Sequence, residues 1–213
     1  MNSPARWDPA SLRLIAITDS LRDGVDGLAS RALRAVLGGA TMIQLRLQDE
    51  SPRTLVDVAR ALRAAVPQVP LLVNARADVA MAAGAQGVHL AVDDISPAAL
   101  RRAFPPGLII GVSVGDETEV PHSAGADYVG IGPVFGSGGT TGTGTAIGIP
   151  RFAALARQCG LPAVAIGGVS MENAGAVMRA GAAGIAVISA LFASPDPTQA
   201  ARALRAAQDA SES

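Results

Sequence analysis

The sequence predicts a single-domain α/β protein with the (β/α)8, or TIM barrel, fold, and three observations support this fold class. Eight short apolar runs alternate with amphipathic helical patterns over 213 residues. Each run is apolar at consecutive positions and bounded by turn residues, which is typical of parallel strands covered on both faces. A Gly-Ala step recurs before several runs. We expect one domain over residues 1–213 with a flexible extension over residues 1–11, and a doubly wound open sheet is the competing topology.

The apolar runs and helical patterns give the expected order of elements. Strands are predicted at residues 13–18, 41–46, 70–74, 87–90, 108–113, 127–132, 163–167 and 184–189. Helical patterns between them include residues 26–39, 51–66, 96–104 and 170–181. Several open on Ser or Asp, which are good N-caps. The Gly-Ala steps begin at Gly39, Gly84, Gly125 and Gly181, and glycine suits the left-handed position that ends a helix.

Composition narrows the functional classes. The formal net charge is -1, so the basic face expected of a general nucleic-acid binder is not indicated. All 17 basic residues are arginine, which excludes any mechanism that needs a lysine. The single Cys159 cannot form an internal disulfide, and no apolar run reaches membrane-spanning length. We therefore expect a cytoplasmic protein that binds small molecules rather than nucleic acid or membranes, with a homo-oligomer left open.

A glycine turn at residues 162–170 indicates an anion site. An apolar strand ends at Gly167 and Gly168, and a helical pattern follows. Backbone N–H groups and the positive end of a helix dipole would then point at the same spot. The alternative is that the two glycines only turn the chain.

Polar residues at the expected strand ends are the candidate site. Gln44 and Arg46 are two positions apart, so both face the barrel interior if Ile43 and Leu45 face the helices. An inward Arg46 indicates a ligand, and the alternative is a structural ion pair. Asn74 ends its strand as an uncharged donor and acceptor.

Two carboxylates and a flexible loop complete the candidate residues. Asp93 and Asp94 suit a hard cation held together with substrate phosphates, although Asp94 would equally fit a loop that caps the helix after Ser96. The Gly- and Thr-rich residues 132–148 have the composition of an active-site lid, or of a surface loop without a role. His89 is expected to pack in the core with its ring bonded to backbone. No Ser-His-Asp or Cys-His arrangement for nucleophilic catalysis can be assembled from the sequence.

In these strand ends the sequence resembles thiamine phosphate synthase and the related thiazole tautomerases, from about Leu14 to Ala193. The resemblance is carried by AITD, QLR, NAR, GVHL followed by DD, IGVSV, GADYVGIGPVF, TAIG, AIGGVS and GIAVIS. Members of this family are (β/α)8 barrels. They join a pyrimidine methyl diphosphate to a thiazole phosphate with Mg²⁺ and release diphosphate.

The resemblance implies two substrate pockets and one metal site. The implied pyrimidine diphosphate residues are Gln44, Arg46, Gln48, Asn74, Ser113 and Thr140, with Arg46 and Ser113 as the catalytic pair. The implied thiazole phosphate residues are Ser137, Gly138, Gly139, Gly168, Ile188 and Ser189. Asp94 falls on a family Mg²⁺ ligand, and Asp93 is a second candidate. Such chemistry needs neutralisation of the departing diphosphate and alignment of the thiazole nitrogen.

Three charged groups of the family pattern are absent. Gln48 and Ala75 replace a lysine and an aspartate, and the lid lysine falls at Thr140. Arg76 is a candidate replacement cation, and Asp93 a replacement metal ligand. Two alternatives to a synthase therefore stay open: a thiazole tautomerase-like barrel, and a noncatalytic phosphate-binding paralogue.

Overall fold

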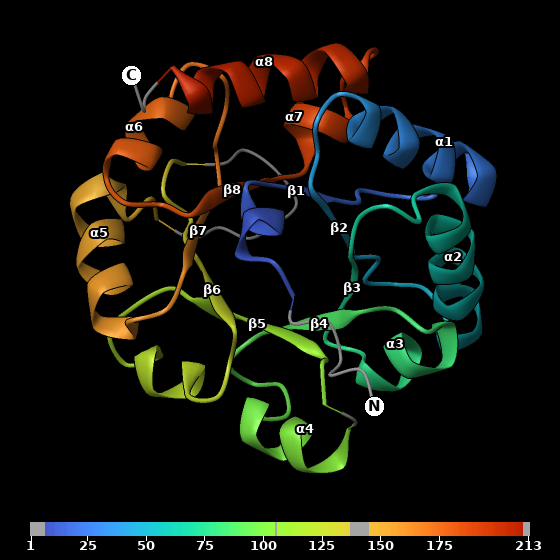
Figure 1. Cartoon of the computed structure of the whole chain (residues 1–213), viewed down its shortest axis with the longest axis horizontal. Helices are drawn as coiled ribbons and strands as arrows, with labels where there is room; N and C mark the ends of the chain where they lie inside the picture. Colours follow the sequence, from blue (N-terminus) through green and yellow to red (C-terminus); the bar gives the residue numbers. More distant parts are fainter. Residues whose placement is uncertain (1–6, 105, 137–144, 211–213) are drawn as a thin grey trace.

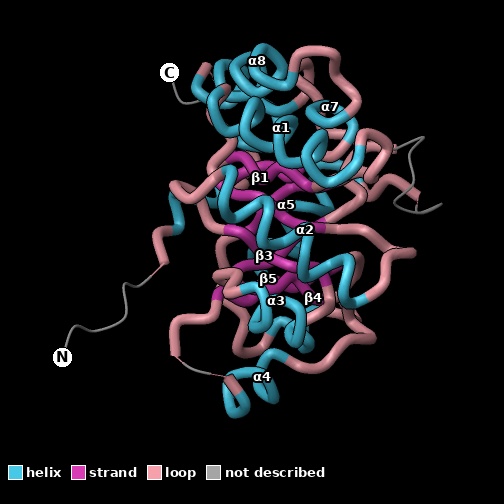
Figure 2. Tube along the Cα trace, turned by 90° about the vertical axis from the view of Figure 1, so that its right-hand side faces the viewer, coloured by secondary structure: helices cyan, strands magenta, loops and turns pink. Residues whose placement is uncertain are grey.

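Eight parallel strands close into a barrel in the computed structural model of the chain, which describes residues 7–104, 106–136 and 145–210. Each strand pairs with the next in sequence, and β8 pairs with β1. Figure 1 shows helices around this ring of strands, and Figure 2 shows the same arrangement from the side. The predicted (β/α)8 barrel is confirmed, and the open-sheet alternative is wrong because the sheet has no free edge.

All eight predicted strands form, each shortened by a residue or so at its ends except the fourth and fifth. The strands are β1 Leu14–Ile17, β2 Met42–Leu45, β3 Leu71–Asn74, β4 Gly87–Leu90, β5 Ile109–Val114, β6 Tyr128–Ile131, β7 Ala163–Ile166 and β8 Gly184–Val187. The α-helices are α1 Gly24–Leu37, α2 Pro52–Ala65, α3 Ala77–Ala83, α4 Pro97–Ala103, α5 Gly148–Cys159, α6 Ala174–Arg179, α7 Ser189–Phe192 and α8 Pro197–Asp209. Two 3₁₀ helices, η1 Pro9–Leu12 and η2 Val120–Ser123, lie before β1 and between β5 and β6.

Helix ends follow local sequence chemistry. The side chains of Ser51 and Ser96 accept hydrogen bonds from the first turns of α2 and α4, as N-caps do. The glycines of all four Gly-Ala steps have positive φ. The pattern over residues 170–181 becomes helical only at Ala174, because the Asn173 side chain accepts a hydrogen bond from the Ser170 amide in a turn that precedes the helix.

Strand residues alternate between two apolar cores. Ile43, Leu45 and their equivalents on other strands pack against the surrounding helices. Inward residues such as Ile15, Met42 and Leu72 form a smaller cluster inside the barrel. The inward residues near the carboxyl ends of the strands therefore gather at one end of the barrel. This is the end at which (β/α)8 barrels hold their active sites.

The amino end of the barrel is covered by η1. Leu12 is fully buried in the interior cluster, and Trp7 packs against the same cluster. Figure 1 shows the short blue helix over the centre of the strand ring. The described part of the expected extension, residues 7–11, therefore contacts the barrel, whereas residues 1–6 lie outside the described residues. The domain limits at both ends stay a prediction.

None of the helices in the described ranges is long and apolar enough to cross a bilayer.

Candidate functional site

Inward polar residues from four neighbouring strands meet at the carboxyl end of the barrel. Gln44 comes from β2, Asn74 from β3, His89 from β4 and Ser113 from β5. All four line a cavity of about 270 Å³, together with Arg46, Gly167 and Ile188. The expectation that Gln44 and Arg46 face the interior is confirmed. One cavity thus joins polar residues that lie 69 positions apart in the sequence, from Gln44 to Ser113.

Arg46 is a half-buried cation without a counter-charge in the described part of the chain. Its backbone exchanges hydrogen bonds with the Thr18 hydroxyl, but its guanidinium makes no bond or ion pair with a described residue. Burial lowers the pKa of Arg46, because desolvation disfavours the charged form. The structural ion pair considered as an alternative is not formed among the described residues, which leaves a positive charge facing the cavity.

A second cavity of about 330 Å³ adjoins the first and shares Arg46 and Asn74 with it. Gln48, Ala75 and Arg76 also line it. The guanidinium of Arg76 donates hydrogen bonds of 2.8 and 2.5 Å to Asp78, and this hydrogen bonding raises the pKa of Arg76. The candidate replacement cation therefore lies at this cavity with its charge already paired.

An amide pair forms the wall between β2 and β3. The Gln44 side-chain Nε2 donates a 3.0 Å hydrogen bond to Asn74 Oδ1, and Gln44 is 3% exposed. The bond orients both amides and leaves the Asn74 NH₂ group as a donor beside Arg46. The two predicted residues thus act as one unit.

His89 connects the site to the interior of the barrel through side chains. Its Nδ1 lies 2.8 Å from the Tyr128 hydroxyl, and its Nε2 lies 3.0 Å from Ser113 Oγ. The expected backbone bonding of the ring is wrong, because both ring nitrogens are used by inward side chains of β5 and β6. A neutral imidazole has one donor and one acceptor, so whichever nitrogen carries the proton, the ring holds Ser113 Oγ in place.

Two inward glycines provide the space for this chain of side chains. A Cβ on Gly111 would lie 2.3 Å from the Tyr128 ring, and one on Gly130 would lie 3.1 Å from His89. Both glycines are on strands, and neither has a positive φ. Their function is to leave room inside the barrel for Tyr128 and His89.

We predict a pH dependence of stability from His89. Burial lowers the pKa of His89 from 6.5 to about 4. Between pH 6.5 and pH 4, His89 binds a proton in the unfolded chain but not in the folded chain. The free energy of unfolding therefore decreases as the pH falls below 6.5, and it keeps its full value above pH 6.5. From pH 7 to about pH 5, wild type should lose on the order of 2 kcal/mol more than His89→Gln. Urea titrations at both pH values measure this, and equal losses in the two proteins would contradict it.

The glycine turn after β7 is built by positive φ and close packing. Gly167 and Gly168 have φ values of 89° and 65°. A Cβ on Gly168 would lie 2.7 Å from the Phe135 carbonyl oxygen, so the loop after β6 packs directly on the turn. The amides of Gly168 and Ser189 donate no backbone hydrogen bond to a described residue. The glycines therefore do turn the chain, and they also leave N–H groups available for an anion.

Asp93 and Asp94 lie in the loop between β4 and α4, and neither lines the two cavities. Oδ2 of Asp94 accepts a 2.7 Å hydrogen bond from the Ala91 amide. No cluster of three His, Cys, Asp or Glu side chains suited to a metal occurs in the described ranges. Asp94 still has one carboxylate oxygen without a described partner, which suits Mg²⁺ only if substrate phosphates complete its coordination.

Four predicted site residues fall outside the described ranges, and two polar residues at or behind the first cavity were not predicted. Ser137, Gly138, Gly139 and Thr140 lie outside the described residues. Glu119 lines the first cavity and accepts a 2.6 Å hydrogen bond from the Gly115 amide. Tyr128 is 1% exposed and bonds His89. The prediction considered polar residues at the carboxyl ends of strands. It missed Glu119, which lies beyond the end of β5, and Tyr128, which begins β6.

Comparison with known proteins places the chain in a family. The model of the family described as thiamine monophosphate synthase matches residues 14–191. Thiamine-phosphate synthase of Azorhizobium caulinodans is 47% identical over 201 residues, covering 92% of this chain and 95% of the relative. The same-named protein of Roseiflexus sp. is 43% identical over 194 residues, covering 89% of this chain and 82% of the relative.

Solved structures agree with the sequence comparison. Thiamine phosphate pyrophosphorylase from Pyrococcus furiosus superposes with a TM-score of 0.84 at 32% identity, covering 96% of this chain and 99% of that one. A 3-hexulose-6-phosphate synthase, with a TM-score of 0.74 and 22% identity over 92% of this chain and 99% of that one, shares the fold. The chain therefore belongs to the thiamine monophosphate synthase family and is an enzyme of the transferase class.

Proposed function

We propose that the chain joins 4-amino-2-methylpyrimidine methyl diphosphate to thiazole phosphate, forming thiamine phosphate and releasing diphosphate in thiamine biosynthesis. The observation that carries this proposal is the uncompensated charge of Arg46, half-buried at a cavity that also presents Gln44, Asn74 and Ser113. A buried cation without a partner is costly unless a ligand supplies the anion. A diphosphate leaving group provides that anion. The named relatives favour this reaction over the tautomerase-like and noncatalytic alternatives.

In the proposed reaction the bond between the methylene carbon and the diphosphate oxygen breaks, and the diphosphate leaves with the electron pair. The thiazole nitrogen then donates its lone pair to the same carbon. Arg46 stabilises the charge that develops on the departing oxygens. No general base is needed, since the attacking nitrogen carries no proton.

The other described residues position the substrates. The paired amides of Gln44 and Asn74 offer hydrogen-bonding groups to the aminopyrimidine or its diphosphate, and Gln48 extends this wall. Ser113, held by His89, contacts the same substrate as the second catalytic residue. The free amides of Gly168 and Ser189 suit the thiazole phosphate. Neither residue lines the first cavity itself, but each follows a residue that does, Gly167 and Ile188. Of the residues outside the described ranges, we assign Ser137, Gly138 and Gly139 to the thiazole phosphate and Thr140 to the pyrimidine diphosphate.

Magnesium is the cofactor in this proposal. Asp94 would hold it, with Asp93 as a second carboxylate and the diphosphate supplying further oxygens. When bound, Mg²⁺ supplies charge neutralisation on the leaving diphosphate. The proposed metal site would therefore be complete only when the diphosphate substrate is bound.

The direct test is an assay of the purified protein with both substrates and Mg²⁺. We expect thiamine phosphate and diphosphate in equal amounts, measured by chromatography and a coupled diphosphate assay. No product would overturn the synthase proposal. Calorimetry with each substrate separately then identifies the alternative, since a tautomerase-like protein should bind thiazole phosphate without Mg²⁺ dependence.

We predict that Ala75→Asp strengthens the use of Mg²⁺. Ala75 has a φ of 61°, a left-handed conformation that aspartate tolerates better than alanine does. It lines the second cavity, and the resemblance places an aspartate there. The added carboxylate should lower the Mg²⁺ concentration for half-maximal activity by about tenfold. Ala82→Asp, an exposed change on α3, is the control, and an unchanged Mg²⁺ requirement in Ala75→Asp would refute the prediction.

A further inference from the structure

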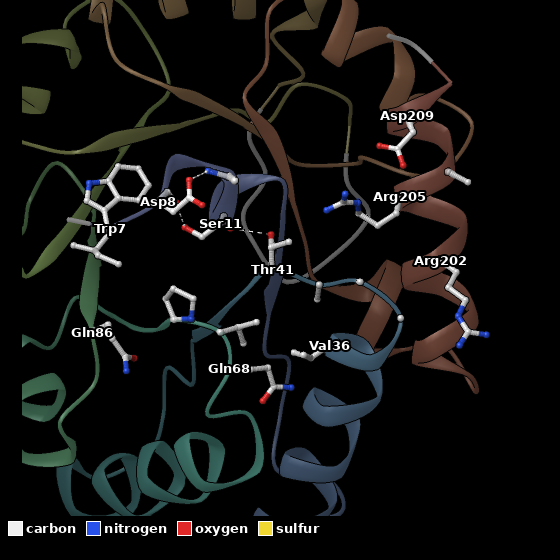
Figure 3. Close-up of a pocket in the computed structure, with 18 of the residues that line it drawn as sticks. Trp7, Asp8, Ser11, Val36, Thr41, Gln68, Gln86, Arg202, Arg205 and Asp209 are labelled. Carbon is white, nitrogen blue, oxygen red and sulfur yellow. Dashed lines mark hydrogen bonds between the residues drawn. The ribbon is translucent and has the colours of Figure 1, made fainter. Parts of the chain in front are cut away.

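A large cavity lies at the amino end of the barrel, opposite the site described above. It has a volume of about 1010 Å³. Its walls come from η1, from the segments that lead into β2, β3, β4 and β5, and from one face of α8. Figure 3 shows this cavity, with Trp7 on one side and α8 on the other. This volume is large enough for a small organic molecule.

The cavity holds a cation that is not neutralised. Of the half-buried arginines in the described ranges, Arg13 and Arg76 pair with carboxylates and Arg46 faces the carboxyl-end site. Arg205 is the remaining one. Its guanidinium has no partner among the described residues, and its Nε is buried without a hydrogen bond. Desolvating this charge has a cost that a bound anion would offset.

Neither neighbouring carboxylate forms an ion pair with Arg205, and each has another partner. Asp209 forms an ion pair with Arg13, with 2.8 Å between Asp209 Oδ1 and Arg13 Nη2. Asp8 Oδ1 accepts a 2.9 Å hydrogen bond from the Ala10 amide and caps η1. Figure 3 shows Arg205 extending toward Thr41 across the cavity, while Arg202, which also lines the cavity, is exposed and points away from Thr41.

Part of the wall suits an apolar body rather than a bare ion. Val36, Val69, Pro70 and Ile109 line the cavity beside the half-buried indole of Trp7. The stem of Arg205 packs over Gly39, where a Cβ would lie 3.0 Å from Arg205 Cγ, so the side chain is supported in its inward position. An apolar surface beside a supported, half-buried cation suits an amphipathic anion.

We propose that this cavity is a second ligand site, which binds a small organic anion with an aromatic or aliphatic body. The anionic group, a phosphate monoester or a carboxylate, pairs with Arg205, and the apolar body packs against Trp7 and Val69. The site is separate from the transferase site, since one is lined by residues that precede the strands and the other by residues that end them.

Trp7 provides the test, because it is the single tryptophan of the chain and lines this cavity. Its fluorescence is titrated with phenyl phosphate, inorganic phosphate and benzyl alcohol as separate probes. We expect a saturable change with phenyl phosphate and at least about tenfold weaker binding of the two probes that have only one of its features. No saturable change with phenyl phosphate, or equal affinity for benzyl alcohol, would overturn the proposal.

Matched arginine variants locate the anion. Arg205→Gln should weaken phenyl phosphate binding about tenfold or more, whereas Arg179→Gln, the same change at an exposed arginine of α6 that does not line the cavity, should leave it within about twofold. Arg46→Gln should leave the Trp7 titration unchanged, since the two sites are separate. Equal weakening by Arg205→Gln and Arg179→Gln would refute a specific site. Thermal melting checks the fold of each variant, and Arg205→Lys, which keeps the charge, should retain more affinity than Arg205→Gln.

Discussion

Replacing Arg46 with glutamine should lower kcat/KM for thiamine phosphate formation about 10²- to 10³-fold. Glutamine retains hydrogen-bonding capacity and much of the side-chain length but removes the charge. Arg46 faces a cavity with no carboxylate or other described group paired to it, so its charge is available to the diphosphate. Because the charge on diphosphate grows as the bond breaks, we expect the loss mainly in kcat. Steady-state kinetics with the pyrimidine diphosphate varied measures it.

The control for Arg46 is an arginine that makes no described contact. Arg102→Gln removes an exposed guanidinium on α4 and should change kcat/KM by less than about twofold. Folding should be little affected by Arg46→Gln, since the native charge has no described partner to lose. A decrease of less than threefold in kcat/KM, with an unchanged melting temperature, would show that Arg46 has no catalytic role. It would also remove the main support for the diphosphate reaction.

Gly111→Ala should destabilise the fold by about 3 kcal/mol, although it adds a single methyl group. The added Cβ would lie 2.3 Å from Cζ of Tyr128, which is fully enclosed in the barrel. Tyr128 cannot swing aside without leaving His89 Nδ1 without its 2.8 Å partner. Chemical denaturation followed by circular dichroism measures the free energy of unfolding.

Two further variants separate this clash from a general effect of alanine. Gly136→Ala introduces a Cβ with nothing within 4 Å and should be nearly neutral. In a Tyr128→Leu background, where the clashing ring atoms are absent, Gly111→Ala should cost much less than in wild type. An equal cost in both backgrounds would show that Tyr128 is not the reason for the glycine.

Sequence periodicity predicted the barrel well because its signals are local. Strands covered on both faces must be apolar at consecutive positions, and the helix ends need glycine at positive φ, as at Gly39 and Gly84. The spacing of Gln44 and Arg46 also placed both at the cavity, since side chains two apart on a strand share a face. These features depend on residues within a few positions of each other.

Tertiary structure alone decided the partners of these side chains. His89 and Ser113 are 24 positions apart, and their contact exists because β4 and β5 pair in the register His89↔Gly111, which brings the next inward residue of β5 beside the ring. The same holds for the isolation of Arg205, which depends on Asp209 pairing with Arg13 across 196 positions. A sequence specifies which groups are charged or apolar over short distances. Whether a charge is neutralised depends on contacts between distant segments, and these exist only once the barrel has closed.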